Sequence, residues 1–435
     1  MSVAHELATI VGEDNVIPGD RSEVTLDGRK PAVIVRPATS EEVAAVVAWA
    51  RTTDHALIVS GQGTRLAMGN PPERCDVLLS LARMNRILDY EPADLTARVE
   101  AGCTLMTFNR TAQSHRQWLP LDPPGSDQAT LGGIVATDDF GPLRYAYGRP
   151  RDYVIGIEVV EGTGRLIKSG GRVVKNVTGY DLNKLFVGSY GTLGVIVRIN
   201  LKLRPRPDGD ATVLVSKAST DALSACARAL LSSELMPAAV LLVNSGAGRM
   251  LGLEPAEPSL LVRFIETEPA IRYQLDRFAE ITAHHALSSI RLDEARAASL
   301  WQTLASTRFL MNCEFILRLS ALPAQTTSLF TFCHQELSQL IENPSVIAYL
   351  GTGVVRAGGM LPRHRFPLLA QVVQTLRAMC RQIGGHLIVE AAPAEIKREL
   401  DAWGEIGPTA SLMRALKQQF DPGRIFSPGR FVAGI

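Results

Sequence analysis

The sequence predicts an α+β protein with two domains and a C-terminal segment, over residues 1–207, 208–400 and 401–435. With 435 residues, the chain is longer than one ordinary domain. The stretch RPRPDGD at 204–210 has the prolines and turn residues of a linker. Before it, short strands alternate with glycine-rich turns. After it, strands and longer helices alternate in two rounds, which favours an antiparallel sheet with helices on one face.

Composition excludes several classes of protein. Hydrophobic residues make up 46% and charged residues 20% of the chain, which excludes a mainly disordered protein. The net charge of +1 provides no basic field for nucleic acid. The sequence contains no run of about 18 apolar residues, so we expect no membrane span. Because the opening MSVAHELATIVGEDN lacks the pattern of a signal peptide, we expect a cytoplasmic protein.

The six cysteines are scattered along the chain, and no CxxC or CxxH pair occurs. They are Cys75, Cys103, Cys226, Cys313, Cys333 and Cys380. We therefore expect buried, reduced thiols, and neither structural zinc nor an iron–sulfur cluster.

Alternating strand and helix signals fill the first domain. Thr39, with Glu42 three residues later, predicts the N-cap of a helix. The predicted strands are Ala32–Val35, Leu57–Val59, Val77–Leu79, Thr96–Val99, Tyr153–Val160, Leu166–Lys168 and Val195–Leu203, with helices at Leu105–Ser114 and Asp181–Phe186. Residues 121–142 (LDPPGSDQATLGGIVATDDFGP) resemble neither a helix nor a strand, and long irregular segments in compact domains are usually functional.

The second domain is predicted as two strand–helix rounds, followed by a final helix. Its strands are Val213–Val215, Ala239–Val243, Leu260–Ile265, Glu314–Leu319, Ser345–Leu350 and His386–Glu390. Its helices are Thr220–Ser232, Pro269–Ala283, Asp293–Ala305, Thr326–Leu340 and Pro367–Ile383, and the C-terminal segment adds Ser411–Phe420.

Three glycine-rich turns in the first domain are candidates for ligand binding. Gly61-Gln62-Gly63-Thr64 offers free backbone N–H groups that suit a phosphate. It is neither a Walker A loop nor a Rossmann fingerprint, because Leu66 stands in the sixth position. The turns at 132–133 and 188–194 are weak signals alone, and each turn is also explained as plain chain reversal. Together they favour a long ligand, because only glycine permits several close backbone approaches.

Four segments in order resemble the FAD-binding domain of the p-cresol methylhydroxylase and vanillyl-alcohol oxidase superfamily. They are IVSGQGTRLAMG, LDPPGSDQATLGGIVATDDFGP, YGRPRDYVIGIEVVEGTG and KNVTGYDLNKLFVGSYGTLGVI, within about residues 30–205. The last segment and the closing LKQQFDPGRIFSPGRF are most similar to the FAD-binding subunit of bacterial glycolate oxidase. The resemblance implies a two-part PCMH-type FAD-binding domain with a ferredoxin-like antiparallel cap, and a C-terminal segment that returns to the FAD domain.

The resemblance also implies roles for individual residues. The turn after the strand at 57–59 would hold the FAD pyrophosphate through backbone N–H groups, the segment at 124–137 would line the dinucleotide and flavin edge, and the turn at 194–196 would meet the adenine. The residues assigned to FAD are Ser60, Gly61, Gln62, Gly63, Thr64, Arg65, Pro124, Asp127, Thr130, Gly132, Gly133, Thr137, Gly141, Arg144, Gly194, Val195 and Ile196. Some relatives attach the flavin covalently through a His in the first turn or a Cys in the second segment. Both are absent here, so we expect non-covalent FAD.

The second domain departs from the resemblance. Related 2-hydroxy-acid dehydrogenases carry a His-x-Gly-Asp-Gly-Asn-x-His run and a later Gly-Glu-His, which help to hold a metal and the substrate. The matching residues 349–356 (YLGTGVVR) lack both His, the Asp and the Asn, and residues 386–391 (HLIVEA) keep only Glu390. Because a divalent cation needs several N or O ligands, we expect no metal.

The sequence leaves the catalytic residues unknown. The weak candidates are His386, Glu390 and Arg356. An arginine on or after a cap strand would suit a substrate carboxylate, and the candidates are Arg263, Arg318 and Arg356. Arg144 and Arg149 follow the irregular segment and are candidates for contact with a phosphate.

Three hypotheses of function follow. The first is a subunit of a glycolate oxidase complex, associated with the membrane through its partners, which passes electrons to a second, longer FAD subunit and an iron–sulfur subunit. The second is a stand-alone FAD-dependent dehydrogenase for another hydroxy acid such as D-lactate. The third is a flavin-holding scaffold subunit without a substrate site of its own. In each case FAD carries the redox chemistry and the protein supplies its binding and electronics.

Overall fold

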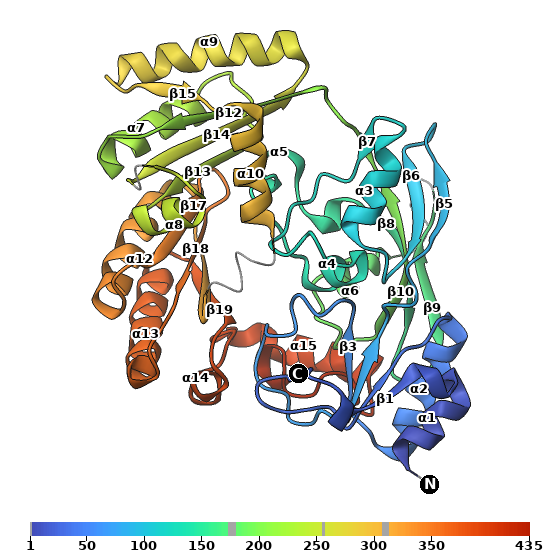
Figure 1. Cartoon of the computed structure of the whole chain (residues 1–435). Coiled ribbons are helices and arrows are strands. Elements are labelled where there is room, and N and C mark those ends of the chain that lie inside the picture. The colour runs from blue at the N-terminus through green and yellow to red at the C-terminus, as the bar shows by residue number, and fades with distance from the viewer. Residues whose placement is uncertain (1, 173–179, 255–256, 307–312) are drawn as a thin grey trace.

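A computed structural model describes residues 2–172, 180–254, 257–306 and 313–435 of the chain (Figure 1). The first half of the chain forms a four-stranded and a five-stranded sheet, and the second half forms a single eight-stranded sheet. In Figure 1 the first half lies on the right in blue to green, and the second half on the left in yellow-green to orange. The C-terminal segment, in red, returns to the first half beside β3 (Leu57–Ser60).

The first half has two layers of sheet. The four-stranded sheet has the order β1-β2-β4-β3 and is parallel across β2, β4 and β3. The five-stranded sheet has the order β5-β6-β10-β8-β9 and is antiparallel throughout. The strands not yet bounded are β1 (Val16–Pro18), β2 (Val33–Val35), β4 (Val77–Ser80), β5 (Ile87–Glu91), β6 (Thr96–Glu100), β8 (Val154–Val160), β9 (Leu166–Gly170) and β10 (Val195–Lys202). The helices are α1 (Val3–Val11), α2 (Ser40–Thr53), α3 (Leu105–Gln113), α4 (Leu131–Thr137), α5 (Arg144–Tyr147) and α6 (Asn183–Phe186).

Local sequence explains where two of these helices begin. The Thr39 side chain accepts a hydrogen bond from the Glu42 N–H and caps α2, as the sequence predicts. Helix α4 is a difference, because it lies inside the segment that we expected to be irregular. Thr130 caps it by accepting from the Gly133 N–H at 3.2 Å. A Cβ on Gly132 would lie 2.7 Å from the Ala101 carbonyl oxygen, so the glycine that lowers helix propensity allows this helix to pack closely.

The second half is one antiparallel sheet with the order β15-β12-β14-β13-β17-β18-β16-β19. We call it the cap sheet. Its strands are β12 (Gly209–Val215), β13 (Ala239–Val243), β14 (Ser259–Glu266), β15 (Ser289–Arg291), β16 (Phe315–Ser320), β17 (Ser345–Tyr349), β18 (Val354–Gly359) and β19 (His386–Ala391). The mixed layers, and the antiparallel cap beside a two-part first half, confirm the predicted α+β class. The expected boundary at 207–208 falls just before β12 and stays a prediction.

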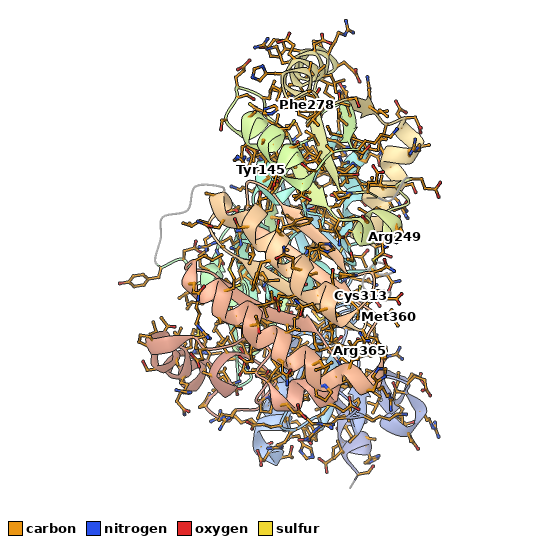
Figure 2. The ribbon with its side chains drawn as sticks, turned by 90° about the vertical axis from the view of Figure 1, so that its left-hand side faces the viewer. Tyr145, Arg249, Phe278, Cys313, Met360 and Arg365 are labelled. Carbon is orange, nitrogen blue, oxygen red and sulfur yellow. The ribbon has the colours of Figure 1, made fainter. Side chains whose placement is uncertain are left out.

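Long helices cover one face of the cap sheet, and Figure 2 views this helical face with Phe278 of α9 at its top. The helices there are α7 (Thr220–Leu231), α9 (Glu268–His284), α12 (Thr326–Leu340) and α13 (Phe366–Gln382). The other face is partly covered by α8 (Ser245–Met250) and α10 (Glu294–Ala305). It is also covered by Phe140 from the first half, so the two halves share this apolar cluster.

Helix α14 (Ala394–Glu399) follows the cap sheet, and the C-terminal segment then adds α15 (Ala410–Phe420) and packs on the first half. The Leu57 N–H donates to the Ile425 carbonyl at 2.7 Å, and the Ser427 N–H donates to the Leu57 carbonyl at 2.9 Å. The tail therefore extends the edge of β3. A small ladder between β7 (Gln117–Trp118) and β11 (Arg204–Pro205) ties the linker to the first half. Among the described residues, no helix combines the length and apolar character needed to cross a membrane.

Candidate functional site

A cleft of about 1020 Å³ opens where the end of β3, helix α4 and the turn before β10 meet. We call it the first cleft. Most residues that the sequence assigned to FAD line it. They are Ser60, Gly61, Gln62, Gly63, Thr64, Arg65, Pro124, Thr130, Gly132, Gly133, Thr137, Gly194 and Ile196.

Glycine makes the wall of this cleft from backbone rather than side chains. Gly63 has a φ of +82°, a conformation that L-residues rarely adopt. A Cβ on Gly61 would lie 2.1 Å from Thr130 Oγ1. The turn after β3 and the cap of α4 therefore approach more closely than any other residue type would allow.

Buried cations from the C-terminal part of the chain donate hydrogen bonds to the backbone carbonyls of the same turn. Arg430 donates through Nη2 to the Leu66 carbonyl at 2.7 Å and to the Met68 carbonyl at 2.6 Å. Lys397 Nζ donates to the Ala67 carbonyl at 2.8 Å and the Gly69 carbonyl at 3.1 Å. Two side chains thus satisfy four successive carbonyls of this turn. We call this arrangement the carbonyl clamp.

A second turn of the cleft is held in the same way. Lys417 Nζ donates to the Thr192 carbonyl at 2.8 Å and the Phe426 carbonyl at 2.7 Å, and pairs with Asp421 at 2.7 Å. Burial lowers the pKa of Lys417, although Asp421 acts in the opposite direction. The closing segment of the chain therefore fixes both turns that flank the cleft.

Four residues that the sequence assigned to FAD do not line the first cleft. Val195 is fully buried in β10, and Gly141 packs on Asp122, whose carbonyl oxygen would lie 2.0 Å from a Cβ. The Arg144 guanidinium lies 4.2 Å from the centre of the Phe140 ring. Asp127 also lies outside this lining.

Sequence reasoning missed several residues of the lining. They are Asp139, Tyr190, Gly191, Trp403, Ser427 and Arg430. Ser427 and Arg430 belong to the closing segment LKQQFDPGRIFSPGRF, which was noted as a signature without a place at the site. Asp139 follows α4 and carried no signal that separated it from the neighbouring Asp138.

The cap sheet presents charged residues to the first half near this cleft. Along β16 and β19, Leu317, Leu319, Leu387 and Val389 belong to the core under the helices, so the alternate residues face the other way. Ladder register places Arg318 directly opposite Arg356 of β18, and opposite Ile388 of β19. Like charges facing each other across a sheet are destabilising unless they are compensated.

Two carboxylates compensate these arginines. Arg356 Nη2 lies 2.8 Å from Asp139 Oδ1 and 3.3 Å from Glu390 Oε1. Arg318 Nε lies 3.3 Å from Glu390 Oε1. Arg65 pairs with Asp139 and lies 3.9 Å from Glu390 Oε2. We call these five residues the junction network, because Arg65 and Asp139 come from the first half and the others from the cap sheet.

Burial alone would raise the pKa of both carboxylates of the junction network. The positive charges of Arg65, Arg356 and Arg318 outweigh burial and lower the pKa of Asp139 and of Glu390. Both acids are therefore ionised, and three guanidinium groups face two carboxylates. Glu390 Oε2 and Arg356 Nε have no hydrogen-bond partner among the described residues. One positive charge remains uncompensated in a nearly water-free place.

The catalytic candidates are divided by the structure. Glu390 and Arg356 belong to the junction network, whereas His386 lies in a neighbouring cleft. Arg263 is apart from both, because it pairs with Asp210. Tyr349 Oη lies 3.4 Å from Arg356 Nη1, so the positions compared with metal ligands hold a guanidinium in contact with Glu390. These residues do not fit a divalent cation.

Comparisons with known proteins identify a matching domain family and a shared fold. A model of the FAD binding domain family matches residues 31–170. The fold is shared with p-cresol methylhydroxylase over 98% of this chain and 95% of that one, with a TM-score of 0.78 and 16% identity. The chain therefore has the fold of the PCMH-type flavoproteins, and its first half contains the region that matches the FAD binding domain. This flavoprotein is a FAD-dependent oxidoreductase.

Two relatives carry informative names. The flavoprotein is 26% identical over 429 residues to glycolate oxidase subunit GlcD of Bacillus subtilis, covering 93% of this chain and 89% of the relative. It is 39% identical over 155 residues to glycolate oxidase subunit GlcE of Escherichia coli (strain K12), covering 35% of this chain and 43% of the relative.

The residues of the first cleft fit FAD. Gly61, Gly63 and Gly132 line the cleft with backbone instead of side chains, and backbone N–H groups in such a wall suit a pyrophosphate. The described lining contains no His or Cys, the residue types through which a flavin would be linked. Non-covalent binding stays a prediction.

Proposed function

We propose that the chain is the FAD-binding subunit of a glycolate oxidase complex, which oxidises glycolate to glyoxylate and passes the electrons to a partner subunit. The relatives named glycolate oxidase subunits support this assignment. The observation that carries it is the junction network beside the first cleft, with three arginines against two carboxylates. An anionic substrate is the ligand that such a place favours.

The division of labour follows from the residues. FAD supplies the acceptor of two electrons when bound. The glycine-rich turns hold it through backbone groups, and the carbonyl clamp keeps these turns in position. The junction network provides fixed positive charge at the boundary between the two halves. Because its groups are already oriented, their stabilisation of an anion needs little rearrangement.

The electron outlet is assigned to partners, namely a second, longer FAD subunit and an iron–sulfur subunit. The six cysteines are free thiols, of which the closest in sequence are Cys313 and Cys333. Among the described residues, no group of three or more His, Cys, Asp or Glu is arranged to hold a metal ion. Such a complex would also supply any association with the membrane.

The second candidate is a stand-alone dehydrogenase for another hydroxy acid. It is favoured by a relative named D-2-hydroxyglutarate dehydrogenase from Xanthomonas citri pv. viticola, 26% identical over 92% of this chain and 89% of the relative. In this case the chain alone would turn over its substrate.

Dye reduction separates the two candidates. The isolated FAD-loaded chain should reduce an artificial dye poorly with glycolate or D-lactate, because the metal and base of autonomous relatives have no counterpart at the matched positions. Co-expression with a longer FAD subunit and an iron–sulfur subunit should restore turnover. Comparable turnover by the isolated chain would refute the subunit assignment and favour the stand-alone dehydrogenase.

A further inference from the structure

A second cleft of about 950 Å³ adjoins the first cleft and shares Thr137, Tyr190 and Trp403 with it. It lies between the first half and the ends of β16 and β19. Its charged lining residues are Asp138, Arg149, Arg151, Lys184 and Arg318, and its other titratable lining residues are Tyr190 and His386. None of the FAD assignments except Thr137 lies here, so the second cleft is a separate space beside the cofactor.

The second cleft gathers more positive charge than its own residues compensate. Four cations face it, and Asp138, which pairs with Arg149, is the one carboxylate among the described lining residues. Outside this lining, Asp181 lies 3.8 Å from Lys184 and Glu390 lies 3.3 Å from Arg318. Burial, and then the charges of Arg151 and Arg318, lower the pKa of Arg149. These guanidinium groups are therefore close enough to repel one another. Such a cluster is unfavourable without an anion and favourable with one.

Donor groups are available for that anion. Arg318 contacts Glu390 only through Nε, and within the described residues its two Nη atoms have no hydrogen-bond partner. Its side chain is 12% exposed, which places it in the wall rather than in open solvent. Arg149 Nε is buried and has no partner in the described part of the chain. A planar guanidinium with free donors matches the geometry of a carboxylate.

An acceptor lies on the same wall. His386 and Ile388 are two residues apart on β19 and share a face, and Ile388 stands opposite Arg318. Desolvation by the cleft walls and the positive charge of Arg318 lower the pKa of His386. Its imidazole is thus neutral at pH 7, and one ring nitrogen is free to accept a hydrogen bond.

We propose that the second cleft binds the carboxylate of a small 2-hydroxy acid on Arg318 and Arg149, and that His386 accepts the hydrogen bond of its hydroxyl group. The substrate class in this inference rests on the proposed function. Arg318 on β16 donates to a carboxylate and His386 on the neighbouring β19 accepts from a hydroxyl group, which matches the two polar groups that a 2-hydroxy acid carries on adjacent carbons. The shared wall at Thr137 and Tyr190 would place the acid beside the cofactor.

The test uses a probe that cannot react. 2-Hydroxyisobutyrate carries the carboxylate and the hydroxyl but no α-hydrogen, so hydride loss is impossible. Isobutyrate lacks the hydroxyl, and inorganic phosphate is the general anion. Titration calorimetry on the full FAD-loaded chain should show binding of 2-hydroxyisobutyrate, weaker binding of isobutyrate by about fivefold, and the weakest binding of phosphate.

Variants then separate the roles. Arg318→Met should weaken both acids by about tenfold or more, because a charged donor is lost. His386→Phe should lower the affinity for 2-hydroxyisobutyrate to that for isobutyrate, and the affinity for isobutyrate should not change. The double variant Arg151→Met/Lys184→Met removes charge from exposed positions and should weaken both acids, even if Arg318→Met fails to fold. Arg165→Met, whose side chain is 77% exposed and outside the cleft, is the matched control.

Each outcome decides the inference. It is overturned if neither acid binds, if phosphate binds as tightly as 2-hydroxyisobutyrate, or if the variants bind like the wild type. Binding that depends on Arg318 and His386, together with a complex that fails to oxidise glycolate, would keep the site and reject the proposed function. If the complex oxidises glycolate and its Arg318→Met and His386→Phe variants keep wild-type affinity, the proposed function is kept and the site is rejected.

Discussion

The two walls of the functional site are built in different ways. The first half contributes backbone, in glycine-rich turns that no side chain could replace, and the buried cations of the carbonyl clamp bind the carbonyls of the turn after β3. The cap sheet contributes side chains, namely Arg318, Arg356 and Glu390, placed by the register of three strands. A backbone wall depends on local conformation, whereas a side-chain wall depends on which distant residues become neighbours.

This difference predicts different responses to mutation. A change in the backbone wall should affect cofactor retention, because the turn itself is the binding group. A change in the cap wall should leave FAD bound and affect anions, because the arginines and His386 lie outside the first cleft or at its edge. The predictions below test this separation.

The largest effect is expected for Gly63→Val. A β-branched residue at a φ of +82° is strained by about 1–3 kcal/mol, and its Cβ would lie 3.2 Å from Leu66 Cδ1. We expect FAD affinity to fall by about tenfold or more. The measurement is FAD content after gel filtration, with flavin released by denaturation and circular dichroism to confirm folding.

Gly252→Val is the matched control for this experiment. Gly252 has a similar φ of +72°, but nothing lies within 4 Å of its Cβ position, and it is outside the first cleft. Equal strain without loss of FAD would show that the site, rather than backbone strain in general, is responsible. A folded Gly63→Val protein with full FAD content would show that this turn is not part of the cofactor site.

Sequence reasoning was strongest for the backbone wall. Each glycine-rich turn was a weak signal alone, and Gly61, Gly63 and Gly132 were assigned to FAD through the resemblance of four ordered segments. The return of the C-terminal segment was expected from its resemblance, but its contribution to the lining was not. Lys397 and Arg430 carry no local signal, since a buried cation looks like any surface lysine or arginine until its carbonyl partners are known.

The cap wall could not be assigned for a physical reason. Arg318 and Arg356 are far apart in sequence, and only strand register makes them neighbours. Arg263 had the same sequence signal and instead pairs with Asp210. Arg144, expected to face a phosphate, stacks on Phe140. A one-residue change of register would turn each such side chain to the other face, so local sequence cannot choose among them.

A smaller effect on the cofactor is expected for the pair Lys397→Met/Asp27→Asn. Lys397 is fully buried and pairs with Asp27, so both are changed to avoid leaving a buried charge unpaired. The Ala67 and Gly69 carbonyls lose their donors, and the turn after β3 should become less well positioned. We expect FAD to dissociate about threefold to tenfold faster, measured by the rise of flavin fluorescence after dilution.

Lys168→Met is the control, because this lysine is 66% exposed and lies outside the first cleft. If the Lys397→Met/Asp27→Asn pair has a lower Tm but wild-type FAD dissociation, the carbonyl clamp contributes to stability and not to FAD binding. The backbone wall would then be self-sufficient, and the comparison between the two walls would become sharper.

The smallest effect on the cofactor is expected at the buried carboxyl of Asp122, at the boundary between the two halves, which changes the pH dependence of stability. Burial raises its pKa to about 6, although it accepts from the Leu143 N–H; an unfolded Asp has a pKa near 3.9. Between these values the folded protein retains a proton that the unfolded chain has released, so this group's contribution to stability falls as pH rises from about 4 to about 6. Ionisation at pH 7.5 therefore lowers stability by at most about 3 kcal/mol.

Asp122→Asn keeps an acceptor for Leu143 and cannot ionise. The Tm of this variant relative to wild type should be more favourable at pH 7.5 than at pH 4.5. Because both proteins share all other titrating groups, the difference isolates Asp122, and a difference independent of pH would show that its carboxyl is already ionised in the folded protein at pH 4.5.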